Sequence, residues 1–518
     1  MKNKFSTLLC LLLVMYGAQA QKGAAPDRLY NPPVFTDTDR VIKIQAALPV
    51  LETMYKDHAV KTHYPGLAFG IVADGKLIAS GGYGLANVSK NSPATPQSAF
   101  RIASMTKSIT ALAVLQLRDG GKLRLDDPAY LYIPELKKVS YLTTDAPPVT
   151  IRHLLTHAAG FPEDNPWGDR QLADTDAELL KLITDGILFS AVPGVAYEYS
   201  NLGFALLGKI ITNVSKQPYQ QYINEHILKP LGMTHTYWEF EKVPAPTLAH
   251  GYRWLNNTWR EETLEHDGAY GAMGGLITTI DDFSKYMALH MSAWPPRSEN
   301  ESVVLKRSSL REMHQPWNIS SFLPNYKFPD GRACAIVSAY AYGLRWQRDC
   351  TDRVMIGHSG GLPGFGSQWL FLPDYGIGVV SFSNLTYGGT GGINQRVLDT
   401  LLTLAALKPR ALPPAPILQQ RKEELVNLLP TWNGAEQSGI FAENFFKDYI
   451  MDSLRNEATT LFRNAGTILQ VSDVTPQNNL RGSFVMKGAK KDLHVFFTLT
   501  PENPPLIQEY RIREAANE

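Results

Sequence analysis

The 518-residue chain has almost no net charge, because 50 lysine and arginine residues stand against 49 aspartate and glutamate residues. A nucleic-acid-binding domain usually carries a basic excess that neutralises phosphates, and this sequence has none. Apolar residues make up 44% of the chain and charged residues 19%, as in ordinary globular proteins. We therefore expect folded domains, two or three of them at about 150 residues each, and no nucleic-acid partner.

Long apolar runs are also scarce, and the run that bears on export and on membrane anchoring lies in the first twenty residues. Lys2 and Lys4 precede the short run LLCLLLVMYG, and small residues follow at Ala18–Ala20. This is the pattern of a cleaved signal peptide, and the run is too short to span a bilayer comfortably. A retained anchor is the alternative. We predict a signal peptide over 1–20 and an exported protein, periplasmic or secreted, with no membrane span after cleavage.

Cysteine is rare, with three residues in the chain. Cleavage would remove Cys10 and leave Cys334 and Cys350, which two short strand patterns separate. In an oxidising compartment an even pair favours a bridge. We predict a Cys334–Cys350 disulfide, with two buried free thiols as the alternative.

The order of the patterns indicates the domain organisation. Two apolar runs flank the turn Asp74-Gly75, which is a strong hairpin signal, and further strand patterns lie between 334 and 382. The region between them is mostly helical. This predicts one domain over 21–407, with a sheet assembled from both its ends and an inserted helical region.

A Pro-rich linker is predicted at KPRALPPAP, residues 408–416. A helical pattern and then several strand patterns follow over 417–518, which indicates a small α+β domain. This segment resembles the cone-shaped fold of nuclear-transport-factor-like (NTF2-like) domains, and we find no catalytic set of residues in it.

The stretch GHSGG fits G-x-S-x-G, the strand-to-helix turn that exposes the nucleophile of α/β-hydrolases. That motif needs a helix after Ser359, whereas Pro363 and several glycines follow. The one histidine downstream, His494, lies beyond the linker. We therefore predict that Ser359 is not a nucleophile.

A better nucleophile is Ser104, in the only S-x-x-K of the chain, which ends at Lys107. Residues three apart share one face of a helix, so the amine would lie beside the hydroxyl. A serine needs an adjacent base, and burial can lower the pKa of a lysine amine enough for that role. The alternative is a capping serine and a surface lysine.

Two further elements carry chemistry. Tyr199-Ser200-Asn201 precedes an apolar helical pattern, and His358-Ser359-Gly360 lies on a predicted strand. A tyrosine hydroxyl beside a lysine can shuttle protons, and an asparagine amide can bind a carbonyl. A core tyrosine and an N-capping asparagine are the alternative for the first element.

Together the three elements resemble the serine hydrolases related to class C β-lactamases, D,D-peptidases (penicillin-binding-protein-like) and their esterase relatives, in which K-T-G takes the place of His358-Ser359-Gly360. Other local matches are TIRHLLTHAAGFP, GGKLRLDDP and GAMGGLITTIDDFSKYM. The resemblance implies an α/β (α+β) fold, with a β-lactamase/transpeptidase-like antiparallel sheet flanked by helices.

The resemblance also implies roles for the motif residues. Ser104 would be the acylated nucleophile, with Lys107 and Tyr199 as base and proton shuttle. Asn201 would bind the substrate carbonyl, and the strand of His358, Ser359 and Gly360 would line the pocket. The oxyanion hole would use the backbone N–H groups of Ser104 and Gly361.

A pair of histidines raises the question of a metal. His153 and His157 have the i, i+4 spacing of a zinc site, but no glutamate follows His153, so H-E-x-x-H is not met. We read both as structural and predict neither a metal nor another cofactor.

We conclude from the sequence that the chain is an exported serine hydrolase acting on esters or amides through an acyl-enzyme. Its substrate would be a small molecule or derived from peptidoglycan, as for an esterase, a D-aminoacyl or D,D-peptidase, or a weak β-lactamase. A transacylase and a non-catalytic peptidoglycan sensor are the alternatives. Since histidine is mostly neutral at pH 7, His358 would attract an anionic β-lactam less than a lysine would. The alternative is that His358 only packs, with an arginine elsewhere binding the carboxylate.

Overall fold

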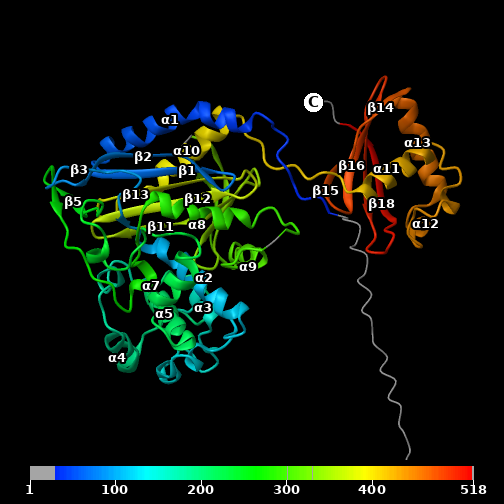
Figure 1. Ribbon diagram of the computed structural model, residues 1–518. Coiled ribbons are helices and arrows are strands. Elements are labelled where there is room, and N and C mark those ends of the chain that lie inside the picture. The colour runs from blue at the N-terminus through cyan, green and yellow to red at the C-terminus, as the bar shows by residue number, and fades with distance from the viewer. Residues whose placement is uncertain (1–29, 300, 329–330, 516–518) are drawn as a thin grey trace, which may run out of the picture. The chain divides into compact units, whose positions relative to one another are not determined.

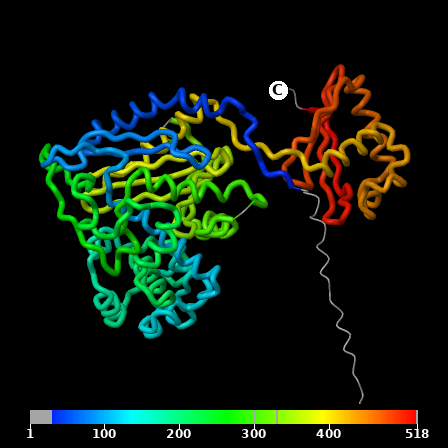
Figure 2. The backbone as a smooth tube through the Cα atoms, viewed as in Figure 1, coloured from blue at the N-terminus to red at the C-terminus, as the bar shows by residue number. Residues whose placement is uncertain are grey.

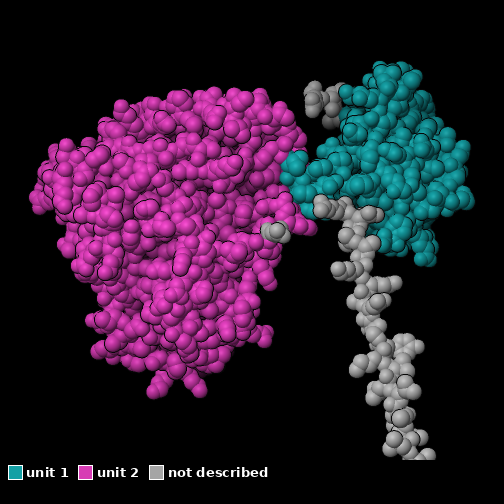
Figure 3. All heavy atoms as spheres, viewed as in Figure 1, with its two compact units in different colours: residues 1–34, 412–518 teal, residues 35–411 magenta. Residues whose placement is uncertain are grey.

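The computed structural model describes residues 30–299, 301–328 and 331–515, so the predicted signal peptide and Cys10 lie outside the described residues. The described chain divides into a large compact unit over 35–411 and a small one formed by 412–515 with 30–34 (Figure 3). The boundary between 411 and 412 falls within the Pro-rich segment for which we predicted a linker.

A nine-stranded antiparallel sheet forms the centre of the large unit, in the order β3-β2-β1-β13-β12-β11-β10-β9-β8 (Figure 1). Its strands are β1 Gly66–Ala73, β2 Lys76–Asn87, β3 Ser92–Pro93, β8 Asn318–Lys327, β9 Ala333–Tyr340, β10 Arg345–Asp349, β11 Val354–Leu362, β12 Phe365–Leu372 and β13 Ile377–Ser383. Two small sheets pair β4 Phe100–Arg101 with β7 Ile277–Thr278 and β5 Tyr252–Leu255 with β6 Thr258–Glu261.

The sheet joins the two ends of the large unit, as the sequence predicted. Strand β1 lies beside β13 although the two are far apart in the sequence (Figure 2), and they pair so that Gly70 lies opposite Val380. The predicted hairpin between β1 and β2 is confirmed. Its turn residues Asp74 and Gly75 have φ of 51° and 75°, the left-handed conformation that a two-residue turn between twisted strands requires.

Helices cover both faces of this sheet, which explains why every residue of β1 and β13 is buried. Helices α1 Arg40–Lys61 and α10 Gly391–Leu404 pack together on one face (Figure 1). Helix α8 Ile280–Ser292 packs on the other face, where the inserted helical region begins. The remaining helices of the large unit are α2 Thr106–Asp119, α3 Ile151–Leu155, α4 Asp176–Gly186, α5 Asn201–Ser215, α6 Tyr219–Ile223, α7 Gly271–Gly274 and α9 Arg307–Met313. The architecture is the predicted antiparallel sheet flanked by helices.

Helix α2 runs through the interior of the helical region, against α5 and α7. All but three of its residues are buried, as its nearly all-round apolar pattern requires, and it ends at Gly120. A buried helix of this kind holds any side chain on its first turn in a fixed place, away from water.

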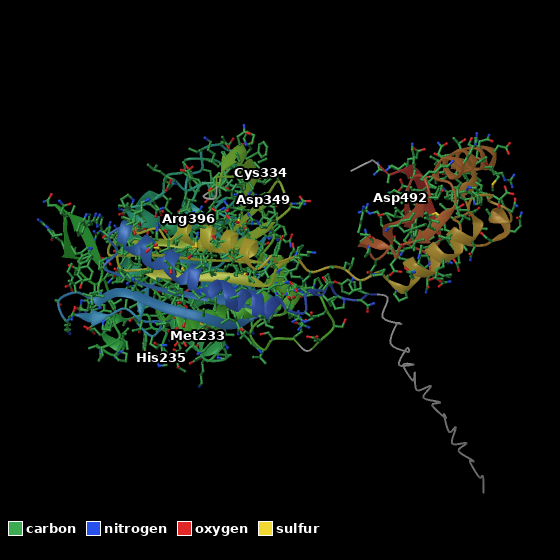
Figure 4. The ribbon with its side chains drawn as sticks, turned by 90° about the horizontal axis from the view of Figure 1, so that it is seen from above. Met233, His235, Cys334, Asp349, Arg396 and Asp492 are labelled. Carbon is green, nitrogen blue, oxygen red and sulfur yellow. A yellow bond between two sulfur atoms is a disulfide. The ribbon has the colours of Figure 1, made fainter. Side chains whose placement is uncertain are left out.

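Cys334 on β9 and Cys350 after β10 form a disulfide, with Cα atoms 5.9 Å apart. Asp349, the neighbour of Cys350, lies beside Cys334 at this end of the sheet and accepts ion pairs from Arg332 and Arg353 (Figure 4). The bridge and the ion pairs together join the start of β9 to the end of β10, at the opposite end of the hairpin from its connecting loop.

The small unit has helices followed by an antiparallel sheet, consistent with an α+β domain. The helices are α11 Pro416–Leu428, α12 Phe445–Asp448 and α13 Met451–Ala465. The strands are β14 Ile468–Val471, β15 Thr475–Asn478, β16 Arg481–Gly488, β17 Leu493–Leu499 and β18 Ile507–Glu514. They enclose a core of their own around Trp432, Phe445 and Phe497.

The disulfide gives a first prediction. Closing a loop of about fifteen residues stabilises a fold by roughly 3 kcal/mol in the chain-entropy model. We expect Cys334 and Cys350 to resist alkylation under denaturing, non-reducing conditions, and reduction to lower the urea midpoint of the large unit. Peptide mass spectrometry with and without reductant measures the first, and urea titration the second. Alkylation of both thiols without reductant would contradict the bridge.

Candidate active site

Ser104 lies at a sharp change of chain direction between a strand and a buried helix. Strand β4 leads into the short 3-10 helix Ala103–Met105, and α2 follows at once. Ala103 has a φ of 52°, an uncommon value for a residue other than glycine. Strained backbone of this kind clusters at functional sites, where the surrounding structure enforces it.

Gly360 explains how the sheet comes so close to this turn. A Cβ atom at Gly360 would lie 2.2 Å from the carbonyl oxygen of Ile102 and 3.0 Å from the Cβ of Ala103. Any side chain would therefore push β11 away from the turn. The glycine of the His358-Ser359-Gly360 element thus serves the approach of two backbones.

The amine of Lys107 is completely buried and lies directly beside the serine. Its Nζ donates hydrogen bonds to Ser104 Oγ at 2.9 Å, to Asn201 Oδ1 at 2.7 Å and to the carbonyl oxygen of Met273 at 3.0 Å. Burial lowers the pKa of Lys107 to about 7, against the opposing effect of the carboxylates of Asp169 and Asp164. Near neutral pH a large fraction of this lysine is therefore an uncharged amine.

Tyr199 completes the predicted trio. The Lys107 amine lies 4.9 Å from the centre of its ring. Burial raises the pKa of Tyr199, and a hydrogen bond with Ser104 and the charge of Arg345 lower it by less. The tyrosine hydroxyl is accordingly protonated at neutral pH, while the neighbouring lysine is near its own titration point.

The side-chain amide of Asn201, which we expected to bind a substrate carbonyl, is hydrogen-bonded within the protein. Its Oδ1 accepts from Lys107, and its Nδ2 donates to Asn165 Oδ1 at 2.7 Å and to Asp169 Oδ1 at 3.4 Å. The amide has no donor left for a substrate carbonyl in this structure. It links the lysine to the loop that carries Asp164 and Asp169.

That loop brings buried carboxylates to the site. Asp164 accepts hydrogen bonds from the backbone N–H groups of Asn201 and Leu202, at the start of α5. Asp169 accepts from the hydroxyl of Tyr387 at 3.0 Å. Burial raises the pKa of both aspartates, and the charge of Lys107 lowers it. The pKa of the Lys107 amine and the pKa values of the two carboxylates therefore depend on one another.

A cavity of about 410 Å³ opens over Ser104, and we call it the Ser104 cavity. It is lined by Ser104, Asn165, Pro166, Asp169, Tyr199, Arg345, Ser359, Gly361 and Tyr387. Ser104 and Gly361, whose N–H groups we predicted as the oxyanion hole, thus lie on the same cavity. Neither His358 nor Gly360 lines it.

His358 is buried behind the cavity wall, which corrects the expectation that it faces the substrate. Its Nε2 bonds to the hydroxyl of Tyr340 at 2.8 Å, and its Nδ1 to the carbonyl oxygen of Ser359 at 2.5 Å. Burial holds its pKa well below the usual value, and the charges of Arg345 and Lys107 lower it further. His358 is therefore a neutral packing residue.

The structure agrees better with the alternative that His358 only packs and that an arginine supplies the positive charge at the pocket. Arg345 is exposed at the start of β10 and lines the Ser104 cavity. Its guanidinium lies 5.7 Å from the ring centre of Tyr199. Arg345 thus places a permanent positive charge at the Ser104 cavity, as the alternative of an arginine elsewhere requires.

Ser359 has none of the surroundings of a nucleophile. It lies in the middle of β11 and not at a strand-to-helix turn. Both ring nitrogens of the neighbouring His358 are engaged elsewhere. Nothing in the geometry favours the G-x-S-x-G interpretation.

His153 and His157 have structural contacts. His153 closes a capping box with Thr150 at the start of α3, and His157 Nδ1 accepts from the N–H of Ser200 at 3.1 Å. In the described part of the chain, no group of three or more histidine, cysteine or acidic residues is placed to hold a metal. Within the same residues, no helix combines the length and the apolar character that a membrane crossing needs.

A family model described as Beta-lactamase matches residues 51–403 of this chain. This span carries Ser104, Lys107, Tyr199 and the strand of Ser359. The chain belongs to the beta-lactamase family.

Curated relatives agree with this membership. Protein flp of Staphylococcus aureus is 31% identical over 340 residues, which are 65% of this chain and 62% of that protein. The match therefore spans less than two thirds of that relative's length. Beta-lactamase-like protein 2 of Dictyostelium discoideum is 27% identical over 499 residues, covering 89% of this chain and 86% of its own.

Solved structures support the fold. An octameric penicillin-binding protein homologue from Pyrococcus abyssi aligns over 90% of this chain and 99% of its own, with a TM-score of 0.58 and 22% identity. A penicillin-binding protein from Bacillus halodurans covers 69% of this chain and 98% of its own, with a TM-score of 0.52 and 23% identity. At these identities the similarity concerns the fold alone.

Sequence reasoning missed Asp164, Asp169 and Arg345 in this beta-lactamase-family site. The two aspartates lie in a loop, PEDNPWGD, that has no regular spacing to the S-x-x-K motif. Arg345 begins β10, RWQRD, and belongs to none of the motifs of the sequence. A Pro- and acid-rich loop before the Y-x-N element was the only available signal for the aspartates.

The buried lysine makes stability depend on pH. Its folded pKa of about 7 lies below the ordinary lysine value of 10.5, so between these values the unfolded chain binds a proton that the folded chain does not. Stability relative to a Lys107→Met variant should therefore rise with pH across this window, by about 2 kcal/mol from pH 7 to pH 9. Urea denaturation of both proteins at the two pH values measures the difference, in which other titrating groups cancel. An unchanged difference would contradict the buried amine.

Proposed function

We propose that this protein is a serine hydrolase that cleaves esters or amides through an acyl-enzyme on Ser104. One observation carries the proposal: the fully buried Lys107 has a pKa of about 7, and its Nζ lies 2.9 Å from Ser104 Oγ on the wall of a cavity, so that the charged form donates to Oγ and the neutral form can accept its proton. A base for serine must be close, uncharged and titrating near the working pH, and this amine meets each requirement.

The proposed first step uses the neutral amine of Lys107. It takes the proton of Ser104 while Oγ bonds to the substrate carbonyl carbon. The N–H groups of Ser104 and Gly361 stabilise the oxyanion that forms, as donors fixed in place before the reaction. The tetrahedral intermediate then collapses and expels the alcohol or amine.

Tyr199 is suited to the second proton transfer. Its hydroxyl is protonated at neutral pH and hydrogen-bonded with Ser104. It gives its proton to the leaving group and regains one from protonated Lys107, whose amine lies over its ring. Water then attacks the acyl-enzyme by the same steps in reverse.

Asn201 acts in this scheme as a positioning residue for Lys107. Its Oδ1 accepts from the amine, while Asp164 accepts from its backbone N–H and Asp169 from its side-chain amide. The amine therefore meets an acceptor that is itself held in place from two sides.

We further propose that the protein is exported to the periplasm or secreted. The support is the pattern of its first twenty residues, in which two lysines precede a short apolar run and small residues follow it.

The nucleophile can be tested directly. A fluorophosphonate probe should label Ser104, on the tryptic peptide Ile102–Lys107. Labelling should disappear in Ser104→Ala and persist at Ser104 in Ser359→Ala, the matched variant on the facing wall. Lys107→Ala should lose roughly 10²–10⁴-fold in kcat/KM for a chromogenic ester, the usual contribution of a positioned base. Label on Ser359, or full activity in Ser104→Ala, would overturn the proposal.

The same site predicts a pH profile. Because Lys107 must be uncharged to accept a proton and its pKa is about 7, kcat/KM should rise tenfold per pH unit below this value and level off above it. Initial rates on one short-chain ester from pH 5 to pH 9 give the profile. A rate that is flat from pH 5 to pH 8 would exclude Lys107 as the base. A product burst distinguishes turnover from binding alone, and added acceptor alcohols would reveal transacylation.

A further inference from the structure

Tyr387, in the loop between β13 and α10, has a backbone conformation that bulky side chains disfavour. Its φ is 50°, in the left-handed region, where a large residue is an outlier. Strained residues of this kind persist where the surrounding structure enforces them, and they cluster at functional sites. The side chain of Tyr387 lines the Ser104 cavity, so the strain lies at the site of the proposed reaction.

Hydrogen bonds anchor the backbone at this position. The N–H of Thr386 donates to the carbonyl oxygen of Tyr252 at 2.7 Å, and the Thr386 hydroxyl donates to the same oxygen at 3.0 Å. The N–H of Tyr387 donates to the carbonyl oxygen of Leu362, the last residue of β11, at 3.2 Å. These bonds fix the direction in which the tyrosine side chain leaves the loop.

The ring of Tyr387 lies against Gly361, whose N–H group belongs to the proposed oxyanion hole. A Cβ atom at Gly361 would lie 3.0 Å from Cδ1 and 3.8 Å from Cε1 of the tyrosine. At the far end of the ring, the hydroxyl donates to Asp169 Oδ2 at 3.0 Å. Since Gly361 and Asp169 both line the Ser104 cavity, the tyrosine forms the wall between them.

The hydroxyl end of the ring is held by a buried group. Asp169 is 2% exposed, and its other oxygen accepts from Asn201 Nδ2. Burial and the charge of Asp169 raise the pKa of Tyr387 to about 12, so the hydroxyl stays protonated and keeps donating near neutral pH. Tyr387 itself is 43% exposed, yet both its backbone and its hydroxyl are bonded to the protein.

The proposed mechanism indicates which part of a substrate meets this ring. The leaving group must lie at Tyr199, which gives it a proton. Tyr387 lies instead against Gly361, the donor to the carbonyl oxygen, and bonds to the loop of Asp169. The part of the substrate that remains to face the ring is the acyl chain.

We propose that Tyr387 is a specificity-determining residue that restricts the Ser104 site to short acyl groups. This rests on the proposed function and narrows its substrate class. Because the backbone holds the ring against Gly361, each added methylene of a longer acyl chain meets a wall at this place. Proteins often reject a competing ligand by such a built-in clash.

Two matched pairs of esters test the proposal. The acyl pair is 4-nitrophenyl acetate and 4-nitrophenyl hexanoate. The control pair, phenyl acetate and 4-butylphenyl acetate, lengthens the leaving group by the same number of carbons. The wild type should prefer the acetate of the acyl pair by about tenfold or more in kcat/KM, within the range by which pockets discriminate chain length.

Three variants separate the ring from the other properties of Tyr387. Tyr387→Gly and Tyr387→Asn remove the ring, and both new residues tolerate the left-handed backbone, so the loop keeps its conformation. Each should raise the hexanoate-to-acetate ratio of kcat/KM by about tenfold or more. Tyr387→Phe loses the same hydrogen bond to Asp169 but keeps the ring against Gly361, so it should change the ratio only slightly. The ratio within the control pair should be the same in all four proteins.

The outcomes separate this proposal from the function on which it rests. Hydrolysis that depends on Ser104, with an unchanged acyl ratio in Tyr387→Gly and Tyr387→Asn, overturns the proposal and leaves the hydrolase intact. A change confined to Tyr387→Gly would come from a flexible loop, and one that is equal in Tyr387→Phe would come from Asp169. Either result overturns the role of the ring, and an equal shift in the control pair overturns its place beside the acyl group.

If the wild type hydrolyses none of these esters, methylboronic and pentylboronic acid replace the acyl pair. Boron accepts an electron pair from Ser104 Oγ while the hydroxyl proton passes to Lys107, so a tetrahedral boronate forms without a leaving group. Protection of Ser104 from the fluorophosphonate probe measures the affinity. Tyr387→Gly and Tyr387→Asn should favour pentylboronic over methylboronic acid by about tenfold more than the wild type does.

An unchanged ratio of these affinities, or no binding of either acid by a protein whose Ser104 is labelled, overturns the proposal alone. A wild type in which the fluorophosphonate probe does not label Ser104 overturns the proposed function and this inference with it.

Discussion

The burial of one amine, that of Lys107, is the constraint on which the site depends. A charged ammonium is costly to bury, and the protein meets the cost by letting the amine lose its proton near neutral pH. The partners of the amine come from three separate parts of the chain: Ser104 on its own helix turn, Asn201 at the start of α5, and Met273 in α7. The helical region must fold completely before this amine has an acceptor for each hydrogen bond.

The sheet meets a second requirement: β11 lies close to the turn before Ser104 and still leaves the serine hydroxyl open to a cavity. β11 approaches the turn before Ser104 to a distance that only a glycine at 360 permits. Residues of this strand alternate in direction: Ser359 lines the Ser104 cavity, whereas the buried His358 bonds to Tyr340 on β9. The disulfide joins the start of β9 to the end of β10. It therefore fixes both strands, and with them the position of Arg345 at the start of β10.

Much of this arrangement could be predicted from the sequence, for local reasons. The Asp74-Gly75 turn, the apolar helix after Ser104 and the strand runs before residue 383 are each fixed by periodicity and turn residues. β8 was not predicted, because it is an edge strand whose side chains are mostly exposed and lack an alternating pattern. Asp164 and Asp169 were missed since a loop has no period, and their effect on Lys107 depends on distances that only the folded chain sets.

The role of His358 shows most clearly where sequence reasoning stops. A motif places a residue on a strand, but whether its side chain faces solvent or the core depends on the register and on the partner opposite. Here Tyr340 from β9 engages one ring nitrogen and a backbone carbonyl the other, so the histidine stays neutral inside the protein. The fixed charge comes instead from Arg345, at the start of the adjacent strand β10, which pairs with β11 so that Arg345 lies opposite Gly357. The register in which β10 pairs with β11 thus brings the charge of Arg345 to the Ser104 cavity, which His358 does not line.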